Sequence, residues 1–236
     1  MKRVFISFLI AVVICAFLFS CHDKKDSLTI DYKDTYYPLD TGKYLVYDVD
    51  SISCYNTNFI IDTVHYQYKE MVTDTFYDNQ NRLNYELSYY RRADANSPWV
   101  FDRKWSAFKT LNNVQKNEGD LRFIKLVFPP QPAFTWDGNL YIAKIPPYDI
   151  FENWNYQYIT VDAPYSINAY NFDSAAVVVD VADSNFVSKH WRKEVYAKHI
   201  GKVYEEYEMK TKQYADNWYT GRWNGFAIQM RLTDHN

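Results

Sequence analysis

The sequence predicts an all-β protein, built as a single antiparallel meander domain that forms a barrel or half-barrel. Aromatic residues, which favour strands, make up 19% of the 236 residues, against only 6 glycines. Apolar and polar side chains alternate with a period of two in several segments. No sustained helical stripe follows the N-terminal apolar run. A two-sheet sandwich is the alternative that these observations leave open.

The first twenty residues predict a signal peptide. Lys2 and Arg3 supply a positive start, and residues 4–19 form an apolar run. As a helix this run would span about 24 Å, which is short of the roughly 30 Å hydrocarbon core of a membrane. A cleaved signal is therefore favoured over a permanent transmembrane helix.

The end of this run, Leu18-Phe19-Ser20-Cys21, resembles the lipobox of bacterial lipoprotein signal peptides. The resemblance implies that Cys21 is lipidated, becomes the new N-terminus and anchors the protein to a membrane. An ordinary secretory peptide is the alternative. Cys15 would leave with the signal, so Cys54 would be the single remaining thiol and no intramolecular disulfide is expected.

Residues 21–35 predict a flexible tether, and residues 36–236 predict a single β-rich domain. His22-Asp23-Lys24-Lys25-Asp26 resembles the charged stretch that acts as a surface-export signal in Bacteroidetes lipoproteins. Surface-facing and periplasm-facing display both remain open. Residues 21–236 carry 24 basic and 29 acidic side chains, a net charge of −5, which argues against a nucleic-acid partner.

Strands are expected where the alternation is clearest, in residues 45–50, 82–89, 177–182 and 226–233. If a barrel closes, the last of these strands should pair near the first. Asp137-Gly138-Asn139 predicts a hairpin turn, and residues 78–81 and 117–120 predict four-residue loops. Prolines 129, 130 and 132 should end the strand that reaches Phe128, and residues 148–158 could hold one short helix.

The chain contains four short elements that follow one another in sequence: Pro38-Leu39 with Gly42 and Val46-Tyr47, Phe128-Pro129 with Trp136-Asp137-Gly138-Asn139, Tyr196-Ala197-Lys198-His199-Ile200-Gly201-Lys202-Val203-Tyr204-Glu205-Glu206, and Gly225-Phe226. They resemble elements of a group of uncharacterised Bacteroidetes outer-membrane lipoproteins. The resemblance implies a β-rich envelope lipoprotein and supplies no catalytic residues. His199 and Lys202 depart from the group's pattern, which has a glycine and an aliphatic residue there.

Sequence motifs of enzymes and metal sites are absent from the chain. No GxSxG, HExxH, GxGxxG or GxxxxGK[ST] pattern and no CxxC occurs, and no two histidines have i, i+4 spacing. We therefore expect no enzymatic activity, no cofactor and no metal. Glu205, Glu206 and Glu208 are interpreted as solvated charges. A hydrolase with dispersed carboxylates is the less favoured alternative.

The strongest candidate for a binding site is the connection before the last strand. It carries Trp218, Tyr219, Arg222 and Trp223, more rings than a turn requires. We therefore expect a lipid-anchored outer-membrane protein whose non-enzymatic β domain binds a small ligand or an envelope protein. A carbohydrate-binding accessory protein that stacks sugars on exposed aromatic rings is the alternative.

Overall fold

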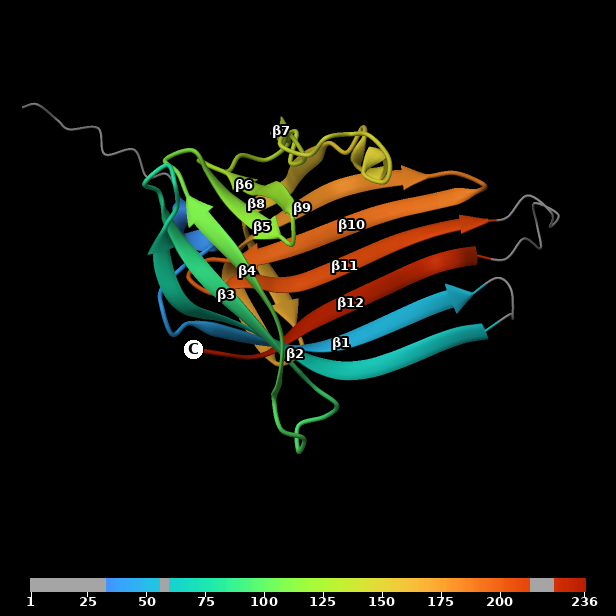
Figure 1. Ribbon diagram of the computed structural model, residues 1–236, viewed down its shortest axis with the longest axis horizontal. Coiled ribbons are helices and arrows are strands. Elements are labelled where there is room, and N and C mark those ends of the chain that lie inside the picture. Colours follow the sequence, from blue (N-terminus) through green and yellow to red (C-terminus); the bar gives the residue numbers. More distant parts are fainter. Residues whose placement is uncertain (1–32, 56–59, 213–222) are drawn as a thin grey trace, which may run out of the picture. The chain divides into compact units, whose positions relative to one another are not determined.

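The structure is a computed structural model that describes residues 33–55, 60–212 and 223–236. It is all-β, as predicted, and the described strands form a single antiparallel sheet (Figure 1). Two short 3-10 helices, η1 (Asp34–Tyr36) and η2 (Asp149–Phe151), accompany it. The strands are β1 (Tyr44–Tyr55), β2 (Ile60–Tyr77), β3 (Leu83–Arg92), β4 (Val100–Lys109), β5 (Asn113–Glu118), β6 (Leu121–Val127), β7 (Thr135–Trp136), β8 (Tyr156–Ile167), β9 (Tyr170–Ser184), β10 (Ser188–Ala197), β11 (Gly201–Lys212) and β12 (Trp223–His235).

The sheet order is β6-β5-β4-β3-β2-β1-β12-β11-β10-β9-β8-β7, and every neighbouring pair is antiparallel. β1 pairs with β12 from Leu45 opposite His235 to Cys54 opposite Gly225. The expected pairing of the first and last strands is therefore confirmed. The β1–β12 pair lies in the middle of the sheet, however. The two edge strands are β6 and β7, which are consecutive strands along the chain.

These two edges approach each other, so the meander is nearly closed into a barrel. The Ile124 N–H donates to the carbonyl of Gly138 at 2.8 Å, and the Trp136 indole N–H donates to the carbonyl of Ile124 at 2.9 Å. The Tyr158 hydroxyl donates to the carbonyl of Val127 at 2.9 Å and accepts from its N–H at 3.2 Å. Two side chains and one backbone carbonyl thus satisfy edge groups that strand pairing would satisfy in a closed barrel.

The expected hairpin at Asp137-Gly138-Asn139 is wrong. β7 ends at Trp136 and pairs with β8, which begins only at Tyr156. Gly138 is needed for space, because a Cβ there would lie 2.3 Å from a ring carbon of Tyr156. The Asn139 amide donates to the carbonyl of Phe151 at 3.3 Å, and so this turn fixes the segment that contains η2.

The other two predicted turns are present in the structure. Asp78 accepts backbone N–H bonds from Gln80 and Arg82, as expected for the loop between β2 and β3. The loop predicted at residues 117–120 is a tighter turn, because β5 continues to Glu118 and Gly119 turns the chain with φ 62°. The short helix expected in residues 148–158 is the three-residue η2.

The strand faces were predicted correctly in β1, where Leu45, Tyr47 and Val49 are buried, but wrongly in part of β9. There the alternation of Val177, Val179 and Val181 with Val178 and Asp180 predicts that the latter two lie on the polar face, but both are fully buried. The reason is that the interior of this barrel-like sheet is lined by charged as well as apolar side chains.

Candidate ligand-binding site

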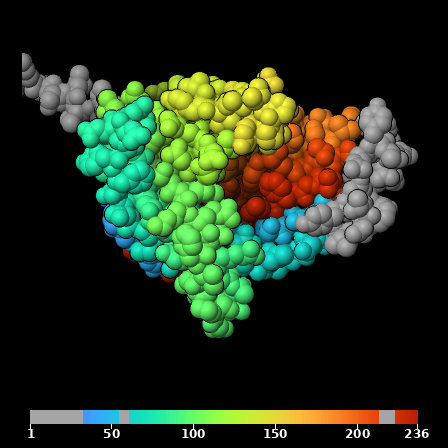
Figure 2. Space-filling model, in the orientation of Figure 1, coloured from blue at the N-terminus to red at the C-terminus, as the bar shows by residue number. Residues whose placement is uncertain are grey.

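The inner face of the sheet surrounds a cavity of about 430 Å³, lined by residues of β1–β6, β10–β12 and η2. Figure 2 shows the hollow from the side on which it opens, with the yellow segment around η2 above it and β11 and β12 as its floor. Pockets that hold small ligands have volumes of roughly 300 to 1,000 Å³. The cavity is therefore large enough for one or two ring units.

One side of the cavity is an aromatic wall, which consists of Tyr66, Tyr68, Tyr89 and Trp105 on the inward faces of β2, β3 and β4. Tyr68 and Tyr89 are stacked with ring centroids 5.3 Å apart. Trp105 meets Tyr89 edge-on at 4.8 Å, and Tyr66 meets Tyr68 edge-on at 6.4 Å. Because the rings sit on neighbouring antiparallel strands, they form one continuous surface.

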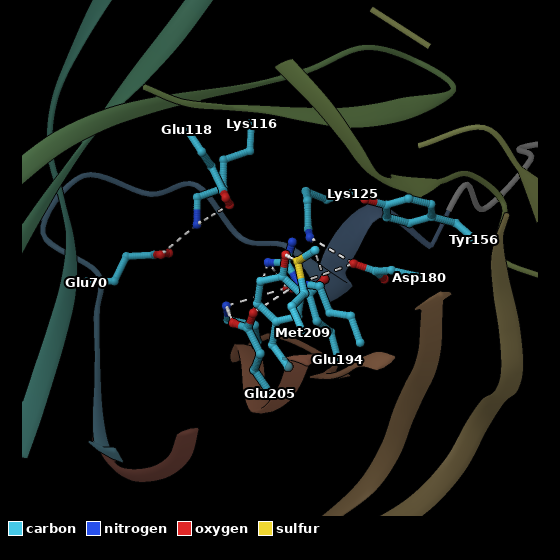
Figure 3. A network of polar contacts seen from close by, with 12 residues as sticks. Glu70, Lys116, Glu118, Lys125, Tyr156, Asp180, Glu194, Glu205 and Met209 are labelled. Atoms are coloured by element: carbon cyan, nitrogen blue, oxygen red, sulfur yellow. Dashed lines mark hydrogen bonds and ion pairs between the residues drawn. The ribbon is translucent and has the colours of Figure 1, made fainter. Parts of the chain in front are cut away.

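The opposite side of the interior holds buried side chains of both charges, which we call the interior charge network (Figure 3). The Lys125 ammonium lies 2.7 Å from Glu194 and 3.4 Å from Asp180. The Arg192 guanidinium lies 2.9 Å from Glu205, 3.4 Å from Glu194 and 3.5 Å from Asp180. The six members carry three formal positive and three formal negative charges: Lys125, Asp180, Arg192, Glu194, Lys202 and Glu205.

A second ion cluster joins this network to the aromatic wall. The Lys116 ammonium lies between two carboxylates, 3.1 Å from Glu70 and 3.6 Å from Glu118 (Figure 3). It also lies over two rings of the wall, 5.3 Å from the centroid of Tyr89 and 5.2 Å from that of Trp105. Cations so placed are stabilised by the ring quadrupole.

Most carboxylates of the interior are held ionised. Burial by itself would raise the pKa of Glu70, but the ammoniums of Lys116 and Lys202 outweigh it and lower the pKa. Burial likewise opposes Lys202 and Arg192 at Glu205, where the two cations lower the pKa to about 2. Asp180 differs, because burial outweighs its cations and raises its pKa to about 7.

The interpretation of Glu205 as a solvated charge is wrong. Its side chain is 7% exposed and paired with Arg192 and Lys202. Glu206, on the opposite face of β11, is half-buried. The partners of Glu205 were also not predicted from the sequence, although the sequence of β10 contains a pattern that indicates a buried ion pair. Arg192, Glu194 and Tyr196 alternate with other residues of β10 and are all buried, and opposite charges on the same strand face as an aromatic residue indicate a buried ion pair.

Four carboxylates line the one cavity: Glu70, Asp102, Glu118 and Glu205. A hydrolase with dispersed carboxylates would need two such groups in one cleft, and linear sequence could not show which carboxylates share a cavity. Asp180, the interior acid with a raised pKa, is fully buried and does not line the cavity.

The residues singled out from sequence mostly lie outside the described part of the chain. This applies to Cys21, Trp218, Tyr219 and Arg222. Trp223 is described: it begins β12, and the Lys212 ammonium lies 4.9 Å from its ring centroid.

Two further findings concern only the described residues. No group of three or more His, Cys, Asp or Glu side chains among them is arranged to hold a metal ion. Within the same ranges, no helix is both long enough and apolar enough to cross a membrane.

His199, a departure from the lipoprotein pattern, has φ 65°, so it adopts the left-handed conformation that a glycine would adopt without strain.

Comparisons with known proteins identify no family. No protein-family model matches the chain, and no curated protein matches it. Among solved structures, the chain is similar to a candidate exported protein with a YmcC-like fold from Bacteroides fragilis. The two share 10% sequence identity at a TM-score of 0.40, over 85% of this chain and 99% of that one.

Proposed function

We propose that the protein is a non-enzymatic binding protein of the cell envelope, which takes a small ring-bearing ligand into its interior cavity. The observation that carries this proposal is the composition of the cavity. An aromatic wall faces ionised side chains across a volume of about 430 Å³. Rings that provide flat apolar area and a few convergent polar groups are the usual components of a small-molecule site.

The charged interior supports a binding role because buried charges stabilise a fold less than apolar side chains of similar volume. Buried ion pairs pay desolvation penalties that an apolar filling avoids, so they contribute little to stability. Arg192, Lys202 and Glu205 nevertheless line the cavity and are nearly buried. Groups held in place by such a network can bind a ligand with little loss of side-chain entropy on binding.

Binding without catalysis is supported by the protonation states. Hydrolysis with two carboxylates needs one protonated acid beside an ionised partner, both facing the substrate. Glu70 and Glu205 have lowered pKa values and are paired with cations. The acid with a raised pKa, Asp180, is fully buried and does not line the cavity.

The envelope location rests on the lipobox-like sequence that ends at Cys21. We expect the protein to be an outer-membrane lipoprotein, labelled by radioactive palmitate when it is expressed in a bacterial host. The label should disappear in a Cys21→Ala variant, because the acylated thiol is then missing. Label that persists in this variant would contradict the anchor.

The binding function is tested by filling the cavity. Ile228 on β12 lines the cavity, and Ile228→Trp should occupy much of the ligand volume. We expect ligand-detected NMR with a mixed library of sugars, amino acids and aryl acids to find ring compounds that bind the wild type. Ile228→Trp should abolish these signals.

The matched control is Asn224→Trp, which adds the same ring at an exposed position of β12. It should retain wild-type binding. Circular dichroism establishes that each variant is folded, and Met230→Phe replaces Ile228→Trp if that variant does not fold. Binding that survives in both cavity-filled variants, or a library that contains no binder, would contradict the proposed function.

A further inference from the structure

The residues that line the cavity carry one more positive than negative charge, and the surplus lies at its mouth. Deeper inside, three cations are balanced by three carboxylates: Lys116, Arg192 and Lys202 against Glu70, Glu118 and Glu205. At the mouth, Arg91 and Arg103 face a single carboxylate, that of Asp102, and all three residues are exposed. The whole chain has a net charge of −3, so this local surplus is opposite in sign to the charge of the protein.

Arg91 is the cation at the mouth that is available to a ligand. Its guanidinium lies 3.8 Å from the ring centroid of Tyr66, the outermost member of the aromatic wall. Within the described ranges, no carboxylate lies within ion-pair distance of Arg91. Arg103, by contrast, is 2.6 Å from Asp102, which also accepts a hydrogen bond from Tyr68 at 3.0 Å.

The aromatic wall continues from this guanidinium into the cavity. Tyr66, Tyr68, Tyr89 and Trp105 contact one another in sequence, and Lys116 lies over the last two rings. A flat ring that lies along the wall would therefore have its outer end beside Arg91. A guanidinium donates two parallel N–H bonds to a carboxylate, and it keeps its stacked position while doing so.

We propose that the ligand is a ring-bearing anion, whose carboxylate or similar group pairs with Arg91 while its ring stacks on the aromatic wall. This inference rests on the proposed function and adds the ligand's chemical class. An acidic sugar and an aryl acid share this chemistry. A neutral ring would stack equally well but would leave the Arg91 guanidinium without an anionic partner.

Two matched pairs of probes test the inference by isothermal titration calorimetry on the full chain. Digalacturonate is compared with its dimethyl ester, and 2-naphthoate is compared with 2-naphthamide. The acidic member of at least one pair should bind at least about tenfold more tightly than its neutral partner, because a charge-assisted hydrogen bond is lost in the neutral compound. The pair that shows this preference distinguishes the acidic sugar from the aryl acid.

The variant Arg91→Gln should remove the preference, weakening the anion about tenfold and leaving the neutral partner unchanged. The matched control is Lys104→Gln, which removes an exposed cation of β4 that is paired with Glu86 and does not line the cavity. It should leave both affinities unchanged. If acidic and neutral members bind with equal affinity, or if Arg91→Gln keeps the preference, the inference is overturned while the proposed function stands. The proposed function itself fails if no ring compound binds the wild type, or if Ile228→Trp abolishes the binding of none of them.

Discussion

At the scale of single residues, glycines have two roles in this fold, which are conformational freedom and space. Gly42 lies in a turn and Gly201 begins β11 directly after a turn, and both have a positive φ. Gly138 was assigned to a turn as well, but its role is to leave room for the ring of Tyr156. A close approach between residues eighteen positions apart depends on the fold, so local turn chemistry could not predict it.

Asp180 is the residue whose environment differs most from its prediction. It is fully buried, its pKa is raised to about 7, and among the described residues nothing forms a hydrogen bond with its Oδ1 atom. Between about pH 4 and pH 7 the folded protein holds a proton on Asp180 that the unfolded chain has released. The carboxyl therefore contributes stability below pH 4 that is lost as the pH rises through 7.

The variant Asp180→Asn, a mimic of the protonated acid, should remove this loss. Between pH 4 and pH 8, the free energy of unfolding should fall less in the variant than in the wild type, by on the order of 3 kcal/mol. Urea denaturation at a series of pH values measures the difference. Asp183→Asn, at an exposed position of β9, is the control. Parallel pH profiles for the wild type and Asp180→Asn would contradict the assignment.

At the scale of elements, the period-two alternation correctly predicted strands in each of the four segments. The alternation did not predict in every strand which face points to the interior, because that interior is lined by polar as well as apolar side chains. Asp180 and Glu205 are buried beside cations, whereas hydrophobic patterning assigns charged residues to the solvent. The Arg192 and Lys125 partners come from other strands, and a single sequence does not show which strands are neighbours.

Closure of the sheet depends on a few side chains, and Tyr158 is the clearest of them. Its hydroxyl satisfies both backbone groups of Val127 at the edge of β6. Tyr158→Phe should lower the free energy of unfolding by about 1 to 2 kcal/mol, because both groups lose their partner. Amide hydrogen exchange at Val127 should also become faster.

The control for this prediction is Tyr77→Phe, which removes a hydroxyl from a ring that is 67% exposed. It should change stability by less than about 0.5 kcal/mol. If Tyr158→Phe leaves the exchange of Val127 unchanged, the edges are held together by other contacts.

At the scale of the whole molecule, the meander brings together side chains from nine strands around one cavity. The fold class was predictable because alternation and composition are local properties. The cavity was not, since its lining extends from Tyr47 to Met230 and depends on how far the sheet curls. The sequence drew attention to residues 218–223, whereas the strongest candidate site in the described part of the chain is the interior cavity.

The central claim, that this cavity is a ligand site, is tested most directly by NMR of the protein with ¹³C-labelled methionine methyl groups. Met230 lines the cavity and Met71 does not. Titration with 2-naphthoate or digalacturonate should shift the Met230 resonance to saturation and leave that of Met71 unchanged, and Ile228→Trp should abolish the shift. The claim that the cavity is a ligand site is contradicted if neither acidic probe and no ring compound of the library shifts the Met230 resonance.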